Sequence, residues 1–283
     1  MLVQNVKEII DLLEALNPTD EHCYEKAILA YTKLKNFPVN IFEEPENMPV
    51  FRTRTHVDTD FFENINEISF APNNSINYFA RCNRPGQSVF YCSENRPISY
   101  LELIENWIDT KNVGDIMKVT IGRWIIKPKM SSIIVTSPDI ESRISAYDKY
   151  YGAIFDDITN KQEKELKEAN QIFYRYLTTK FRLQAKKDLK TYIITTAYCN
   201  LALIHAKDKA QAICYPSVPS KETGVNWAIS SAFITNNNIE LTNVLRDEFQ
   251  VFKNENDKYD FRQIDNIEAV KINLEASTII WKI

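Results

Sequence analysis

The sequence predicts an α+β fold in which a mixed or antiparallel sheet is surrounded by helices. Strand-like and helix-like segments follow one another without the regular strand–helix–strand repetition that a doubly wound parallel sheet requires. Helical periodicity dominates the first 36 residues, whereas the chain after residue 211 is mostly strand-like. With 283 residues, 44% of them hydrophobic, the chain can bury a core without help from a metal or a disulfide.

Residues 1–36 predict a helical hairpin. Val6, Ile9 and Leu13 recur at helical spacing, the stretch Asn-Pro-Thr after them interrupts the pattern, and EKAILAYTKL resumes it. The Pro-rich, acidic stretch FPVNIFEEPENMPV follows and is typical of a linker. We therefore expect a helical extension with its linker at residues 1–48 and the main domain at residues 49–283.

The segments that follow alternate in character, and strand alternation, helical spacing and turn residues predict their states. In chain order they are strand-like NYFARCN and SVFYCS, helix-like RPISYLELIENWID, two strands in KVTIGRWIIKP and SSIIVTS, helices at residues 139–158, 160–187 and 189–206, and mostly strand-like AICYPS, VNWAISSAFI, IELTNVLRDEF and AVKINLEASTIIWKI. The middle helix is strongly charged, so we expect one of its faces to meet solvent.

The charge balance and the apolar segments exclude two classes of partner. Lys and Arg number 34 against 38 Asp and Glu, so the net charge of -4 lacks the basic surplus that binding to nucleic-acid phosphates draws on. No apolar stretch approaches the length of a membrane span, and the N-terminal segment mixes charges into its apolar positions. We expect a cytoplasmic protein that binds neither nucleic acid nor membrane.

The cysteines and histidines do not indicate a metal site. The five cysteines lack CxxC spacing, and only three histidines exist, which also disfavours a Ser-His-Asp hydrolase. His56, Asp58 and Asp60 lie close together in THVDTDFF, but an N-cap at one of the two aspartates is the favoured interpretation. We expect no bound metal.

Any nucleotide must be held by side chains, because the sequence has neither GxGxxG nor GxxxxGK[ST]. Arginines can grip a pyrophosphate, aromatic rings can stack on a flat ring, and a carboxylate can stabilise developing positive charge. Three segments carry such residues: FRTR, ARCNRPGQSVFYCSENRPISYLELIE and CYPSVPSKETGVNWA. The candidates within them are Arg52, Arg54, Arg81, Tyr91, Glu102, Ser217 and Asn226.

The order of these motifs resembles the RES-domain family over residues 51–228. The pattern is R-x-R, then R-x-N with Gly, Tyr-x-Ser and a helix-borne Glu, then Tyr-Pro-Ser followed by Gly-x-Asn. The resemblance implies a fold related to the ADP-ribosyltransferase toxins and an activity that consumes NAD as substrate, with no separate cofactor. Many members are toxins neutralised by a separately encoded antitoxin. The helical extension and the long charged helix depart from the family pattern, so the oligomeric state and the docking of any antitoxin stay open.

The resemblance also implies roles for individual residues. Arg81, Glu102 and Ser217 would be the catalytic Arg, Glu and Ser of the family. We expect Ser217 to position substrate and not to act as a nucleophile, because no histidine base lies within sequence reach of an obvious triad. The remaining candidates would bind NAD, with Tyr91 at the aromatic position and Arg52 or Arg54 as a contact to an anionic group. Asn226 would orient a ribose of NAD or, alternatively, cap the next segment of the chain.

Glu102 has a competing structural interpretation. Ser99-Tyr100-Leu101-Glu102 has the form of a capping box at the start of a helix, which needs no catalytic role. With the family pattern included, we favour a catalytic role for Glu102. If the family's Glu aligns one helical turn later in this sequence, Glu105 is the catalytic candidate instead. Arg81 lies in the apolar stretch YFARC, where a charge must face a cleft or find a partner.

We therefore expect an NAD glycohydrolase or phosphorylase that cleaves the nicotinamide–ribose bond and acts as a toxin or defence effector. The acceptor of the ADP-ribosyl group, whether water or phosphate, is open. An ADP-ribosyltransferase that modifies a macromolecule would use the same cleft. Two further functions stay open: a nucleotide-binding module without turnover, and a structural partner protein that assembles through the helical hairpin.

Overall fold

The described strands of the computed structural model form one 10-stranded sheet in the order β1-β5-β6-β7-β3-β2-β4-β8-β9-β10. The structure describes residues 2–56, 59–108, 111–143, 145–183, 188–207, 209–217 and 224–282. The strands are β1 (Ile41–Glu44), β2 (Met48–Thr55), β3 (Val89–Ser93), β4 (Ile116–Ile126), β5 (Met130–Ile134), β6 (Ala212–Pro216), β7 (Val225–Ser230), β8 (Ile239–Lys253), β9 (Tyr259–Asn273) and β10 (Thr278–Trp281).

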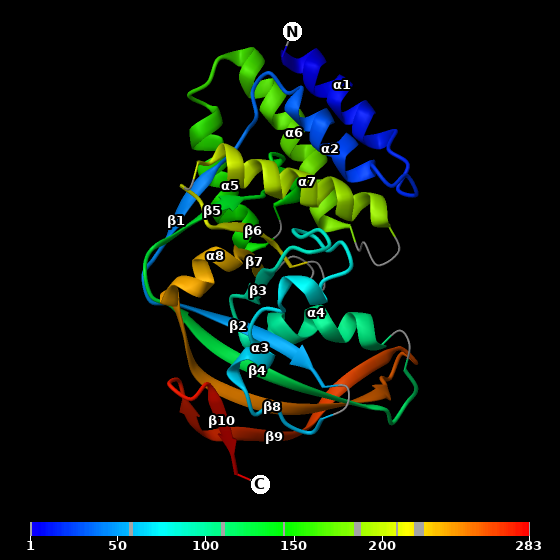
Figure 1. Cartoon of the computed structure of the whole chain (residues 1–283). Coiled ribbons are helices and arrows are strands. Elements are labelled where there is room, and N and C mark those ends of the chain that lie inside the picture. Colours follow the sequence, from blue (N-terminus) through cyan, green and yellow to red (C-terminus); the bar gives the residue numbers. More distant parts are fainter. Residues whose placement is uncertain are drawn as a thin grey trace.

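Strands β5 and β6 run parallel, and the other neighbouring pairs run antiparallel. The helices are α1 (Leu2–Glu14), α2 (Cys23–Thr32), α3 (Ile65–Ile68), α4 (Arg96–Ile108), α5 (Ala146–Thr159), α6 (Lys164–Arg182), α7 (Leu189–His205) and α8 (Ser231–Phe233). The long helices gather at one end of the molecule and the long strands β4, β8 and β9 at the other, with α4 between them (Figure 1). The prediction of an α+β fold with a mixed, mostly antiparallel sheet and surrounding helices is confirmed.

The two predicted N-terminal helices form, and they share a core with the later helices. Helix α1 packs on α6, and α2 packs on α7. Ile9 and Leu13 of α1 are buried in the same cluster as Phe173 of α6 and Tyr198 of α7. The apolar face of α1 is therefore buried against the main domain of its own chain.

Two local predictions were wrong. The stretch predicted as a linker contains β1, which pairs with β5 and so belongs to the sheet. The segment NYFARCN, predicted as a strand, is a loop, which places Arg81 outside the sheet. In both cases the deciding factor is the availability of a partner strand, which local composition does not reveal.

The sheet is nearly split between β2 and β3. Strand β2 pairs with β4 along its whole length, from Met48 to Thr55. Its pairing with β3, within the part of the chain that the structure describes, consists of Phe51 opposite Ser93. The two halves of the sheet thus separate on either side of this residue pair, and the candidate active site lies where they separate.

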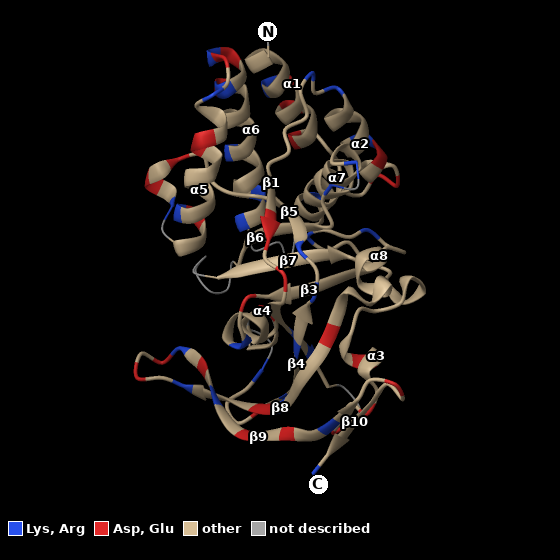
Figure 2. Cartoon of the chain, turned by 90° about the vertical axis from the view of Figure 1, so that its left-hand side faces the viewer, with Lys and Arg blue, Asp and Glu red and all other residues tan. Residues whose placement is uncertain are grey.

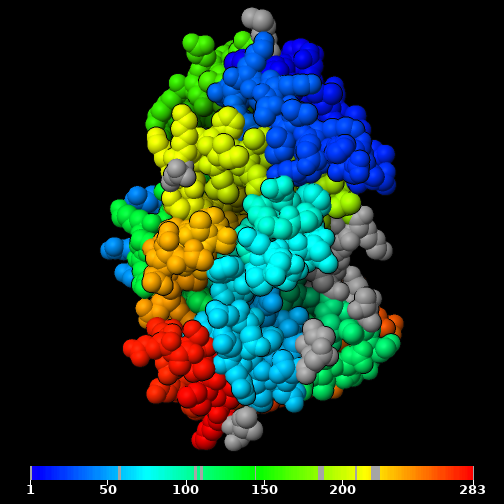
Figure 3. All heavy atoms as spheres, viewed as in Figure 1, coloured from blue at the N-terminus to red at the C-terminus, as the bar shows by residue number. Residues whose placement is uncertain are grey.

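The surface carries charges of both signs. Lys and Arg alternate with Asp and Glu on the helices and outer strands, whereas β6 and β7 carry neither (Figure 2). In the space-filling view, the segment between β2 and α4, in light blue to cyan, lies between the N-terminal helices and the C-terminal strands (Figure 3). Among the described helices, none combines the length and the apolar character needed to cross a lipid bilayer.

The packing of α1 gives a prediction about stability. Leu13→Ala should lower the free energy of unfolding by about 2–5 kcal/mol, because it leaves a cavity in the shared core. Leu12→Ala is the matched control at the neighbouring, 42% exposed position and should change it by less than about 0.5 kcal/mol. Urea denaturation followed by circular dichroism measures both. Equal effects of the two substitutions would show that α1 does not pack as described.

Candidate active site

A cleft of about 570 Å³ opens where β2 and β3 separate. Its walls come from β2, β3, α4, the loop before β3, α7, β6 and β7. Six of the seven predicted site residues line it: Arg52, Arg54, Arg81, Tyr91, Glu102 and Asn226. The seventh, Ser217, has no exposed surface but contacts Glu102 directly. The fold therefore brings together all residues that the motifs singled out.

Hydrogen bonds from two side chains hold the Glu102 carboxylate. Ser217 Oγ and Asn226 Nδ2 each donate to Glu102 Oε1 at 2.6 Å. Asn226 Oδ1 in turn accepts from Ser93 Oγ at 2.6 Å, which fixes which way the amide of Asn226 faces. The network thus joins α4, β3, β7 and the residue after β6, and the carboxylate cannot move without breaking it.

The register of three strands explains why these residues meet. Ser93 of β3 lies opposite Asn226 of β7, and Asn226 lies opposite Tyr215 of β6, so the three side chains share one face of the sheet. Tyr91 precedes Ser93 by two residues and faces the same way. A glycine permits the close approach of α4: a Cβ at Gly224 would lie 2.5 Å from the Cδ1 atom of Ile98.

The capping-box interpretation of Glu102 is wrong. Helix α4 begins at Arg96, and Asn95 Oδ1 accepts a hydrogen bond from the backbone N–H of Ile98 at 3.0 Å, as an N-cap side chain does. Ser99 therefore lies inside the helix, where its hydroxyl contacts Thr53 Oγ1 at 2.7 Å. Glu102 lies in the second turn and lines the cleft. The side chain of Glu105, the candidate for a shifted register, lies outside the described residues.

Arg52 is buried at the junction between β2 and β3. Its side chain is 8% exposed and lies over the ring of Phe90, 5.3 Å from the ring centroid. Its Nε donates to the Ser69 carbonyl at 3.1 Å, and its Nη1 donates to the Tyr91 carbonyl at 2.7 Å. Burial, together with the charge of Arg54, lowers the pKa of the Arg52 guanidinium to about 10, so it stays charged at neutral pH.

The other two arginines differ in what their guanidinium groups contact. Arg81 donates to the carbonyls of Phe181 and Leu183 at the end of α6, and it lies over the ring of Tyr215 at 5.8 Å. Arg54 is half-buried, and no described residue forms a hydrogen bond or ion pair with its side chain. In the described residues none of the three cleft arginines pairs with a carboxylate, so their positive charge is available to an anion.

Four tyrosines line the same cleft. Tyr91 donates to Asn83 Oδ1 at 3.0 Å and accepts from the backbone N–H of Cys82 at 2.8 Å; burial raises its pKa well above the usual value. The others are Tyr78, Tyr192 and Tyr215. Tyr215 and Ser93 belong to the motifs Tyr-Pro-Ser and Tyr-x-Ser, which could have identified them. Tyr78 and Tyr192 carry no such signal and were missed.

The residues considered for a metal cluster lie near the end of β2, and other side chains engage them. His56 contacts Thr120 Oγ1 at 2.8 Å and stacks on Phe62, while Asp60 pairs with Lys118. Asp58 lies outside the described residues. Within the described ranges, no three His, Cys, Asp or Glu side chains gather in a way that could hold a metal ion.

Comparison of the chain with protein-family models and with curated proteins finds no match in either set. The site is therefore characterised by its own geometry. It combines a carboxylate held by two donors, three guanidinium groups without ion pairs among the described residues, and several aromatic rings in one cleft. Such a cleft can bind a ligand that has flat rings joined by an anionic linker, and it can stabilise a positive charge close to the carboxylate.

The cap of α4 can be tested by its effect on stability. Asn95→Ala should lower the free energy of unfolding by about 0.5–2 kcal/mol, because the N–H of Ile98 loses its acceptor. Asn95→Asp keeps an acceptor at the same place and should retain most of the stability. Denaturant titrations of the wild type and both variants measure the difference. If Asn95→Ala proved as stable as the wild type, the start of α4 would have to be reassigned.

Proposed function

We propose that this protein cleaves the bond between nicotinamide and ribose in NAD, by hydrolysis or phosphorolysis. The observation that carries the proposal is the fixed carboxylate of Glu102 in a cleft with three arginines that have no ion-pair partner among the described residues. The resemblance to the RES-domain family, and through it to the fold of the ADP-ribosyltransferase toxins, adds to this argument. The catalytic unit would be residues 49–283.

The cleavage requires stabilisation of a positive charge on the ribose. When the bond breaks, its electron pair goes to the ring nitrogen of nicotinamide, which leaves neutral, and the ribose becomes an oxocarbenium ion. A carboxylate beside that ribose stabilises a charge that is fully developed only near the transition state, and this accelerates the reaction. We assign this role to Glu102. Ser217 and Asn226 hold its Oε1 in place, so no energy is spent on orienting it during the reaction.

The arginines would bind the pyrophosphate. Arg54 has no described partner and can turn both its terminal nitrogens to phosphate oxygens. Arg52 and Arg81 are bonded to backbone carbonyls and form no ion pair with a described carboxylate, so they add to the attraction from fixed positions. An anionic ligand relieves the repulsion between Arg52 and Arg54 that contributes to the lowered pKa of Arg52.

The acceptor completes the reaction. Water attacks the anomeric carbon of the ribosyl cation and loses a proton, which gives ADP-ribose; inorganic phosphate gives the 1-phosphate of the same sugar. Loss of NAD stops growth, so a toxin or defence effector of the cytoplasm is the role that this chemistry fits, with a separately encoded antitoxin as its partner. Transfer to a macromolecule would use the same cleft and the same carboxylate.

The first test of the proposal is nicotinamide release from NAD, with and without phosphate, followed by product chromatography. Glu102→Gln should keep the fold and slow turnover by about 10²–10³, the scale of losing one preorganised electrostatic group. Glu44→Gln is the matched control: Glu44 is also a buried carboxylate that accepts from two side chains, Trp227 Nε1 at 3.2 Å and Tyr151 OH at 3.3 Å, but it lies outside the cleft.

Glu44→Gln should turn over NAD as the wild type does. A fully active Glu102→Gln protein would remove Glu102 from the mechanism and direct the search to Glu105. Intact NAD after prolonged incubation with the folded wild type would refute the proposed cleavage. Radiolabel transferred from NAD to protein or nucleic acid would instead identify a macromolecular acceptor.

A second prediction separates binding of the pyrophosphate from catalysis. Arg54→Gln should raise KM for NAD by about 10- to 150-fold, the scale of one charge-assisted hydrogen bond, and leave kcat within a few-fold, because the phosphates do not react. Arg123→Gln changes an exposed arginine of β4 outside the cleft and serves as the control. Steady-state kinetics measure both. A loss confined to kcat would contradict the assignment of Arg54 to the pyrophosphate.

A further inference from the structure

We propose that Tyr78 and Tyr192 bind the second flat ring of the substrate, so that the enzyme selects the dinucleotide over nicotinamide mononucleotide. The inference rests on the proposed function and extends it to a part of the cleft to which that function gives no role. Neither tyrosine belongs to the motifs that the sequence analysis singled out.

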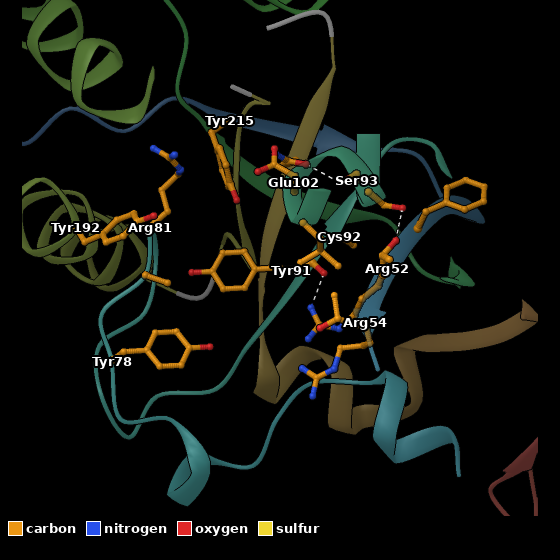
Figure 4. A pocket seen from close by; sticks show the side chains of 17 residues that line it. Arg52, Arg54, Tyr78, Arg81, Tyr91, Cys92, Ser93, Glu102, Tyr192 and Tyr215 are labelled. Carbon is orange, nitrogen blue, oxygen red and sulfur yellow. Dashed lines mark hydrogen bonds between the residues drawn. The ribbon is translucent and has the colours of Figure 1, made fainter. Parts of the chain in front are cut away.

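The cleft has two ends. Figure 4 shows Glu102, Ser93, Arg52 and Arg54 on one side, and Tyr78, Arg81 and Tyr192 on the other, with Tyr91 and Tyr215 between them. If the ribose that reacts lies at Glu102 and a phosphate at Arg54, a mononucleotide is accommodated by the first end alone. The second end then has a function only for a ligand that continues past the phosphate.

The ring of Tyr78 lines the cleft from the loop before β3. Its side chain is 61% exposed. Asn83 Nδ2 donates to the Tyr78 carbonyl at 3.3 Å, and Gly86 N–H donates to the Ile76 carbonyl at 2.8 Å. These bonds hold the backbone on either side of Tyr78 in place, and a stacking partner would cover the exposed face of the ring.

Tyr192 comes from an element that is tied to the same loop. Thr196 of α7 donates from Oγ1 to the Ala80 carbonyl at 2.7 Å. Tyr192 lies four residues before Thr196, and so on the same face of the helix, toward that loop. The two tyrosines thus line the cleft from segments that are joined by a hydrogen bond.

The chemistry of this end favours a nucleobase. Aromatic faces stack on any base, and the guanidinium of Arg81, fixed over Tyr215, adds a positive charge beside the same space. Within the described residues, no carboxylate lines this end to repel the phosphates of the ligand. The structure therefore assigns the purine of a dinucleotide to Tyr78 and Tyr192.

The experiment compares nicotinamide release from NAD and from nicotinamide mononucleotide by the full chain. Tyr78→Leu and Tyr192→Leu should each raise KM for NAD by about 5- to 150-fold, the scale of one base–aromatic stack, with kcat preserved. The same variants should leave the kinetics with nicotinamide mononucleotide unchanged. Tyr259→Leu changes a similarly exposed tyrosine outside the cleft and should behave as the wild type. Tyr78→Phe and Tyr192→Phe keep the rings and should raise KM for NAD by less than the leucine variants do.

Two results would overturn the inference: leucine variants with an unchanged KM for NAD, or an equal loss with both substrates. If the wild type released nicotinamide from neither compound, the proposed cleavage itself would be wrong. Calorimetric measurement of the binding of NAD and of nicotinamide mononucleotide would then still test whether Tyr78 and Tyr192 bind the second ring, because the leucine variants should lose affinity for NAD alone. Retained affinity for NAD in those variants would disprove the ring site.

Discussion

The cleft exists because β2 leaves β3 after a single residue pair, and the Arg52 side chain supplies the bonds that the backbone no longer makes. Its Nη1 donates to the Tyr91 carbonyl of β3 and so connects the two halves of the sheet, while its Nε donates to the Ser69 carbonyl at the end of α3. A lysine ammonium lacks the rigid planar fork that directs these two bonds. Burying this charge is costly, as the lowered pKa of Arg52 indicates, and an anion bound nearby would offset part of that cost.

The helical end of the molecule supports one wall of this cleft. Helix α7 contributes Tyr192 to the cleft and, through Thr196, holds the loop that carries Tyr78 and Arg81. Helix α2 also packs on α7, while α1 packs on α6. The N-terminal helices are therefore part of the scaffold that holds the end of the cleft lined by Tyr78 and Tyr192. Removing them would expose the apolar side of α7 and loosen that wall.

Elements that depend on the local residue pattern could be predicted from the sequence. Elements whose state depends on pairing with a segment far away in the chain could not. The N-terminal helices and α4 follow from apolar spacing, and the central strands from alternation. NYFARCN has the composition of a strand but no strand partner, because its backbone bonds to α7 and within its own loop. The meeting of Glu102 with Ser217 and Asn226 depends on strand register, which the motif order indicated only through the resemblance. Tyr192 lies in a helix whose pattern shows no more than burial.

The position of Ser217 changes the interpretation of the serine in the motif. We expected it to position substrate, but it has no exposed surface and its hydroxyl donates to Glu102. It therefore acts on the carboxylate, and Asn226 acts on the same oxygen from the neighbouring strand. Two donors on one oxygen fix both the place and the orientation of the negative charge before any ligand arrives. In the proposed cleavage of NAD, a carboxylate in water would have to reorient as the ribosyl cation forms, and a carboxylate that is fixed in advance avoids this reorganisation.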